Sequence, residues 1–157
     1  MPHSSDTTDA LLLALQRKYP LPSASPFSAL DFIHAVGSPL DALMYSRLLW
    51  PSFIEVEGMV FLSDAVEDVE DLARVKRVLA HYKGDKKSTQ LDMNRYEIAE
   101  MFGRRTGDTT AQEDECLARI MATTWTAKLQ TEFPRRIQVK VEISDGAGAA
   151  IVFWAET

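Results

Sequence analysis

The sequence predicts an α+β protein: one domain in which about six helices pack on a small, mainly antiparallel, four-stranded sheet. Three observations lead to this prediction. Prolines, glycines and capping residues divide the chain into short segments whose apolar residues recur at helical spacing. In two other segments, 53–62 and 136–156, a strand of alternating apolar and polar residues is followed by a turn and a second, apolar strand, as in β-hairpins. No linker, repeat or low-complexity tract divides the 157 residues, so we expect one domain, 1–157, with 1–7 as a flexible tail.

The first third of the chain predicts three helices. The first follows a cap at residues 7–9 and ends before Pro20. Ser25-Pro26 and Ser38-Pro39 each place an N-cap residue before a proline, which suits the first turn of a helix. We therefore expect two short helices, paired as a hairpin, that end at Gly37 and at Trp50-Pro51. Their apolar residues at helical spacing are Phe27, Leu30, Ile33, Val36, Leu40, Leu43, Met44 and Leu48.

The stretch FIEVEGMVFL predicts the first hairpin, with Ile54 and Val56 on its half-buried face. Gly58 takes positive φ without strain, so the chain is expected to reverse at Glu57-Gly58. Glutamate is a poor first residue for a two-residue primed turn. We therefore expect a slightly longer turn with a bulge at Gly58.

A long helix is predicted from Ser63-Asp64 to about Tyr82, with acidic residues near its start and basic residues near its end. Its predicted inner face consists of Val66, Val69, Leu72, Val75, Leu79 and Tyr82. The segment DKKSTQ, residues 85–90, is predicted to be a loop, and a short helix follows from about Asp92.

The last third predicts a helix and a closing hairpin. Thr110 and Glu113 form a capping box for a helix that ends near Glu132, before Phe133-Pro134. Residues 136–143 alternate cleanly, whereas the closing strand is apolar on both faces. Its second face, with Val152 and Trp154, needs a cover from helices on both sides of the sheet or from a partner.

The composition of the chain indicates where the protein is located and which kinds of partner it is expected to bind. The longest aliphatic run is too short for a membrane-spanning helix, no secretory signal is visible, and a single cysteine allows no intramolecular disulfide. We therefore expect a cytoplasmic protein that does not enter membranes. Residues 1–71 hold 11 acidic against three basic residues, and the whole chain carries a net charge of −6. This balance favours a basic protein partner and makes nucleic acid an unexpected one. The basic segments 74–87 and 104–105 have few aromatic residues for base stacking.

Neither cofactor nor metal is expected. The segment GDKKST, residues 84–89, resembles part of a phosphate-binding loop but lacks the preceding strand and the second glycine. His3, His34 and His81 lie far apart, and Cys116 has no neighbouring ligand, so no metal-binding spacing occurs. The motifs of serine hydrolases, dinucleotide-binding proteins and zinc proteases are also missing.

Two functional hypotheses follow. The first is a non-catalytic protein-binding module, such as an immunity-type inhibitor or an accessory protein, that uses an acidic face. A homodimer through the terminal strand is a further expectation. No catalytic residue is assigned. The expected binding residues are Glu55, Glu57, Glu67, Asp68, Glu70, Asp71 and Trp154.

The alternative is a small, hydrolase-like enzyme without a recognisable motif. It would use Glu55 with His34 or Tyr45 in a cleft between the helical hairpin and the sheet. Glu55 and Glu57 could also lie on one face of a strand, at a separation suited to hydrolysis. A solvated hairpin explains these two glutamates more simply.

Overall fold

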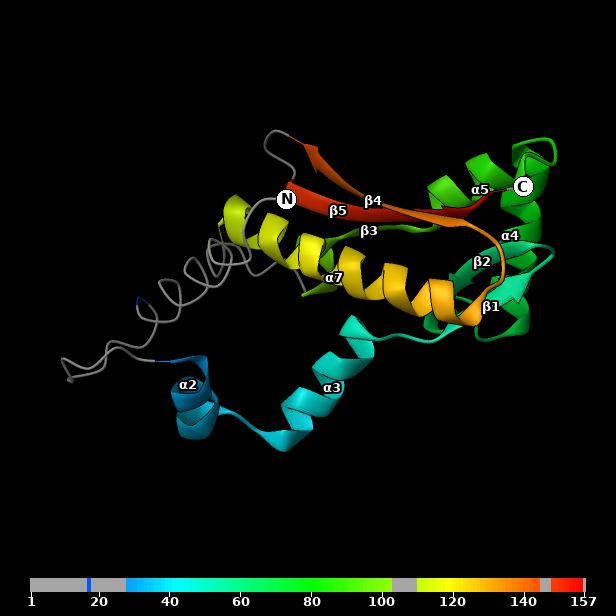
Figure 1. Ribbon diagram of the computed structural model, residues 1–157. Helices are drawn as coiled ribbons and strands as arrows, with labels where there is room; N and C mark the ends of the chain where they lie inside the picture. The colour runs from blue at the N-terminus through cyan, green and yellow to red at the C-terminus, as the bar shows by residue number, and fades with distance from the viewer. Residues whose placement is uncertain (1–16, 18–27, 103–109, 145–147, 157) are drawn as a thin grey trace. The chain divides into compact units, whose positions relative to one another are not determined.

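The computed structural model describes residues 17, 28–102, 110–144 and 148–156, and it confirms the α+β class. The described residues form six α-helices and two small antiparallel sheets (Figure 1). The chain divides into two compact units, Met1–Tyr45 and Ser46–Thr157, and α3 crosses from one to the other. That both units belong to one domain stays a prediction. The predicted tail and nearly all of the predicted first helix lie outside the described residues.

The first unit contains α2 (Ala29–Val36) and the first turns of α3 (Pro39–Leu49). Ser28 caps α2 by a capping box: its hydroxyl accepts a hydrogen bond from Asp31 N, and the Asp31 carboxylate accepts one from Ser28 N. The start predicted at Ser25-Pro26 lies outside the described residues. The start predicted at Ser38-Pro39 is confirmed, because Ser38 Oγ accepts a hydrogen bond from Leu40 N at 3.2 Å.

The first hairpin is confirmed, with β1 (Phe53–Val56) paired to β2 (Met59–Leu62). The predicted longer turn is wrong. Val56 pairs with Met59, so Glu57 and Gly58 alone form the turn, with φ of 51° and 76° as in a type I′ turn. The predicted inner face of β1 also needs correction, because Ile54 is 37% exposed while the Phe53 ring packs against Trp125.

The long helix predicted from Ser63 is interrupted. A 3₁₀ turn, η1 (Ser63–Ala65), comes first, and α4 (Val69–His81) begins only after the buried Val66. The reason is a second cap: Asp68 accepts hydrogen bonds from the backbone N–H groups of Glu70 and Asp71. Val69, predicted on the inner face, is therefore in the exposed first turn and is 83% exposed.

Residues 85–97 differ most from the prediction. The expected loop is a helix, α5 (Lys86–Met93), which Asp85 caps through bonds from Lys87 N and Ser88 N. The short strand β3 (Arg95–Glu97) follows, and α6 (Ile98–Met101) comes next. Strand β3 was not predicted, and the prediction of one four-stranded sheet is wrong. The structure instead has a two-stranded sheet and a three-stranded sheet in the order β3-β5-β4.

Strand β5 (Gly148–Ala155) lies in the middle of the three-stranded sheet, with β4 (Ile137–Ser144) antiparallel beside it. The helix α7 (Ala111–Glu132) runs along this sheet in Figure 1, and its capping box of Thr110 and Glu113 is confirmed. The break at Phe133-Pro134 is confirmed as well.

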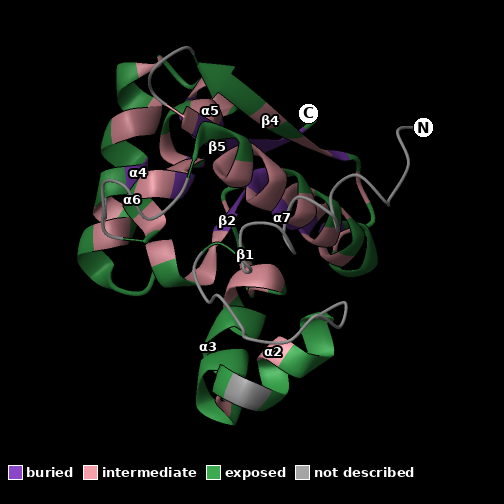
Figure 2. Ribbon diagram, turned by 90° about the vertical axis from the view of Figure 1, so that its left-hand side faces the viewer, coloured by how far each residue is buried: buried purple, intermediate pink, exposed green. Residues whose placement is uncertain are grey.

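Two clusters of buried side chains form the core of the second unit (Figure 2). In the larger cluster, Trp125 and Met121 of α7 pack on Ile151 and Phe153 of β5. The smaller cluster combines β2 with the segment around α4. Strand β2 separates them, because Val60 belongs to the larger cluster and its neighbours Met59 and Phe61 belong to the smaller one.

Candidate functional site

The two glutamates of the first hairpin have different surroundings. Glu55 projects from β1 and forms an ion pair with Arg135, 3.0 Å from Oε2 to a guanidinium nitrogen. Glu57 occupies the exposed tip of the turn. The ion pair gives the Glu55 carboxylate a structural contact between β1 and the segment before β4. That the two glutamates form no catalytic pair stays a prediction.

The acidic residues 67–71 gather at the start of α4, where all but the half-buried Asp71 are exposed. Asp68 and Asp71 bind backbone N–H groups of the same turn, and Asp71 accepts its hydrogen bond from Glu67 N at 3.1 Å. These carboxylates complement the positive end of the helix dipole. The turn therefore presents concentrated negative charge, part of which also stabilises the helix.

Trp154 lies on the sheet face opposite α7 and is only 7% exposed. Lys87 of α5 and Lys140 of β4 lie over its ring, with Nζ atoms 5.4 Å and 5.0 Å from the ring centroid. The second apolar face of β5 is thus covered within the chain at this point. That Trp154 anchors an interface stays a prediction, and such an interface would require these lysines to move.

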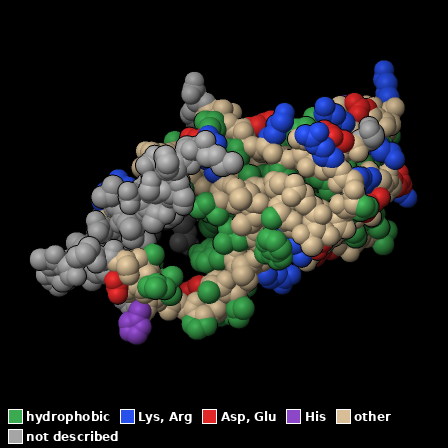
Figure 3. Space-filling view, in the orientation of Figure 1, with side chains coloured by type: hydrophobic (Ala, Val, Ile, Leu, Met, Phe, Trp, Pro, Cys, Tyr) green, Lys and Arg blue, Asp and Glu red, His purple; other side chains and the backbone are tan. Residues whose placement is uncertain are grey.

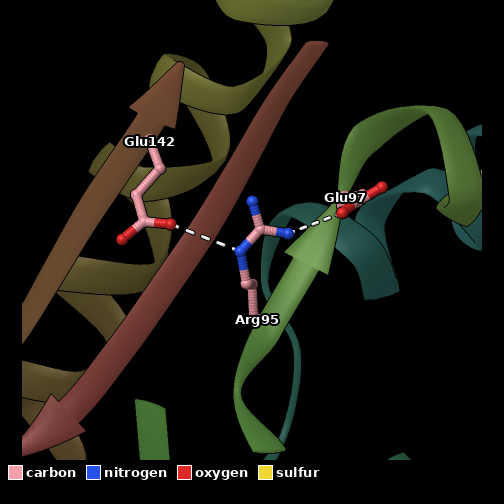
Figure 4. Close-up of polar contacts among 3 residues, drawn as sticks. All are labelled: Arg95, Glu97 and Glu142. Carbon is pink, nitrogen blue, oxygen red and sulfur yellow. Dashed lines mark hydrogen bonds and ion pairs between the residues drawn. The ribbon is translucent and has the colours of Figure 1, made fainter. Parts of the chain in front are cut away.

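The same sheet face carries a row of charges beyond Trp154. Arg95 lies between two carboxylates, 2.6 Å from Glu97 and 3.3 Å from Glu142 (Figure 4). Hydrogen bonds from Arg95 to these glutamates, chiefly to Glu97, raise the pKa of its guanidinium. Arg95 and Glu97 both belong to β3, and Glu142 belongs to β4, so this network links β3 to β4 across β5.

The expected binding residues therefore fall into three places: the first hairpin, the start of α4 and the middle strand β5. His34 and Tyr45 belong to the first unit and Glu55 to the second, so their use as a catalytic pair stays a prediction. Among the residues that the structure describes, no group of His, Cys, Asp or Glu side chains could hold a metal ion. Cys116 is partly buried, and burial, with Glu113 and Glu115 adding to it, raises the pKa of its thiol.

A second candidate surface consists of apolar side chains on the first unit. On α2, Leu30 is 76% exposed, Ile33 59% and Val36 50%. On α3, Leu40 and Met44 are similarly exposed. Figure 2 draws both helices mostly as exposed, and Figure 3 shows hydrophobic side chains in green on them. The sequence shows the apolar periodicity of these helices, from which a packed helical hairpin was predicted.

A groove of about 410 Å³ lies between the end of α7 and the start of β4. Thr126, Gln130 and Phe133 line one side of it. The first residues of β4, Ile137 to Val139, line the other, and Arg135 and Arg136 supply its charged groups. The groove is open to solvent and adjoins the outer edge of the three-stranded sheet.

Comparison with known proteins gives no relative: no family model, curated protein or solved structure matches the chain. None of the described helices has the length and apolar character needed to cross a membrane.

Proposed function

We propose that the chain is a non-catalytic, cytoplasmic protein-binding module whose partner is a basic protein. The observation that carries this proposal is the exposed apolar surface of α2 and α3, formed by Leu30, Ile33, Val36, Leu40 and Met44. Large apolar side chains gathered in one short stretch are a common feature of protein-interaction surfaces. We call this set the α2–α3 surface.

The local structure of α2 supports the proposal. Its capping box organises the first turn through contacts within residues 28–31, so the helix has its own start signal. Leu30 and Ile33 are three residues apart and therefore lie on one side of the helix. Anchors at such spacing are typical of helices that bind in an apolar groove of a partner.

The negative charge of the chain supports the proposal that the partner is a basic protein. The chain carries a net charge of −6, and the start of α4 adds an exposed group of carboxylates: Glu67, Asp68 and Glu70. Long-range attraction of this kind raises the rate of association more than the final affinity. An immunity-type inhibitor that covers the active site of a basic enzyme, or an accessory protein, would use such a surface.

The proposal is tested by capture from an extract of the native host on the immobilised full chain, followed by mass spectrometry. The double variant Leu30→Asp/Ile33→Asp removes the exposed apolar anchors and should lose any specific partner. The control His34→Asp adds a carboxylate to the same helix at an exposed, polar position and should retain that partner. A partner captured equally by all three chains would contradict the proposed surface.

A purified partner then permits a measurement of affinity against salt. The association rate should fall as salt rises, because exposed charges are screened beyond a Debye length of about 8 Å at physiological ionic strength. Replacing Glu67 and Glu70 with glutamine should weaken this salt dependence. A salt-independent association rate would argue against a basic partner.

A further inference from the structure

Strand β4 has one edge without a strand partner in the described part of the chain. Its eight residues pair with β5 on one side only, since β5 lies between β3 and β4. An edge of this length exposes a row of backbone donors and acceptors that can pair with another chain. The terminal strand β5 is internal, and of the two outer edges of this sheet the β4 edge is the longer, because β3 has only three residues.

The register identifies which backbone groups point outward. Arg136 O accepts a hydrogen bond from Glu156 N at 3.0 Å, so residue 136 faces β5. Successive residues of a strand direct their backbone groups to opposite sides. The N–H and C=O groups of Val139, Val141 and Ile143 therefore point to the outer edge.

The side chains of these three residues form an apolar row on the face toward α7. Val139 and Val141 pack against the larger core cluster, whereas Ile143 is 54% exposed. The groove beside Val139, lined by Thr126, Gln130 and Phe133 of the helical side, continues this row. One end of the strand thus has an uncovered apolar side chain, and the other end has an unfilled groove.

We propose that the outer edge of β4 pairs antiparallel with the same strand of a second copy, about a two-fold axis through Val141. In this register Val141 faces its own counterpart, and Val139 faces Ile143 of the second copy. All these residues have outward backbone groups, so each facing pair shares two hydrogen bonds. Each exposed Ile143 then lies beside the groove of the other copy.

Charge on the opposite face favours this register over the two adjacent ones. The same two-fold axis places Lys140 directly opposite Glu142 of the second copy, and the symmetry repeats that pair. Axes through Lys140 or through Glu142 would instead place like charges opposite each other, which destabilises a sheet. Glu142 already binds Arg95 at 3.3 Å, so Lys140 of the second copy would extend an existing network of charges (Figure 4).

This self-association is separate from the α2–α3 surface, and either proposal can fail without the other. The first test is the oligomeric state of the full chain by sedimentation velocity, for the wild type and for Val141→Pro. Because the Val141 N–H points away from β5, proline there removes no bond to β5 and blocks only the outer edge. The wild type should be a dimer and Val141→Pro a monomer with a native near-ultraviolet circular dichroism spectrum.

The matched control is Val141→Thr, which retains the N–H and the branched side chain and should remain a dimer. A wild-type chain that is monomeric at its highest accessible concentration would overturn the proposal. A dimer that persists in Val141→Pro would also overturn it, because that dimer must use another surface.

A charge-reversal experiment decides the matter if Val141→Pro fails to fold. Lys140→Glu and Glu142→Lys each place like charges opposite each other twice, and each should raise the dimer Kd by about tenfold or more. When the two variants are mixed, opposite charges face each other again, so a heterodimer should form preferentially. Single variants that dimerise as tightly as the wild type, or a mixture without heterodimer, would contradict the proposed register.

Discussion

Gln90 of α5 and Asn94, the residue that caps this helix, bind the two backbone groups of the same residue of β2. Val60 N donates to Gln90 Oε1 at 2.9 Å, and Asn94 Nδ2 donates to Val60 O at 2.7 Å. The same two side chains reach β5, where Ala155 N donates to Gln90 Oε1 at 3.0 Å and Phe153 O accepts from Asn94 Nδ2 at 3.1 Å. Both amides are fully buried. Their hydrogen bonds therefore connect β2 of the two-stranded sheet to β5 of the three-stranded sheet, in the way that the backbone of an intervening strand would.

Replacing Gln90 with methionine should lower the free energy of unfolding by about 2–5 kcal/mol, because two buried backbone N–H groups lose their only acceptor. Methionine has a similar length, so the loss reports the hydrogen bonds more than a change in volume. The measurement is unfolding in urea. Asp92→Asn, at an exposed position of the same helix, is the control and should change stability by less than about 0.5 kcal/mol. Equal stabilities of Gln90→Met and the control would show that the amide bridge contributes nothing.

This bridge explains why the region around α5 was the hardest to predict. A capping residue, Asp85, begins the helix, but the polar residues 86–90 show no apolar periodicity, and periodicity is the main signal for a helix. The partners of Gln90 and Asn94 are 30 or more residues away in the sequence. No local pattern reports a contact of that range.

Elements with a local signal were predicted well. Ser38-Pro39, the capping box of Thr110 and Glu113, and the alternation in 136–143 each depend on neighbouring residues. The structure has both helix starts, and the alternating segment forms β4. The start of α4 was missed because Ser63-Asp64 and Asp68 are both good caps, and only the burial of Val66 decides between them. The candidate surfaces are harder to predict than the helices, because exposure of an apolar face depends on packing that the sequence does not record.

The turn at Glu57-Gly58 carries backbone strain that substitution can relieve. Glu57 has φ of 51°, a left-handed conformation that asparagine tolerates better than glutamate. Glu57→Asn should therefore raise the free energy of unfolding by about 0.5–1 kcal/mol. Glu57→Val should lower it by a similar or larger amount, because a β-branched residue is disfavoured at positive φ. Thermal unfolding of the two variants checks this. An asparagine variant less stable than the wild type would mean that the Glu57 side chain has a stabilising role.

Trp125 links the larger core cluster to the end of α3. Its ring is fully buried, and Nε1 donates a hydrogen bond to Leu48 O at 2.9 Å. Trp125→Phe removes that donor and leaves a small cavity, so we expect a loss of about 2–4 kcal/mol in the free energy of unfolding. Trp50→Phe is the matched control. Trp50 is 49% exposed and contacts Lys128, so its substitution should cost less than about 1 kcal/mol. Similar losses for the two variants would contradict the assignment of Trp125 to the core.

The phenol of Tyr96 should make the free energy of unfolding depend on pH in the alkaline range. Its ring is stacked on Phe153 and meets Trp125 edge to face, and its hydroxyl has no hydrogen-bond partner in the described part of the chain. Burial raises the pKa of Tyr96 from its ordinary value of 10.0 to about 12, with the charge of Arg74 opposing the shift only in part. The neutral phenol is thus favoured in the folded state, and the unfolded chain loses its proton first as pH rises.

The Tyr96 contribution to stability is therefore fully present below pH 10.0 and is lost progressively as pH rises through about 12. The total loss should be about 2–3 kcal/mol, since one pKa unit corresponds to about 1.4 kcal/mol. Tyr96→Phe removes the titrating group and the unpaired hydroxyl. At neutral pH this variant should be at least as stable as the wild type, because no hydrogen bond is lost. Urea unfolding of both proteins across the alkaline range should then show the wild type losing stability relative to Tyr96→Phe. Parallel curves for the two proteins would mean that the folded and unfolded states release this proton at the same pH, and that the phenol is not buried.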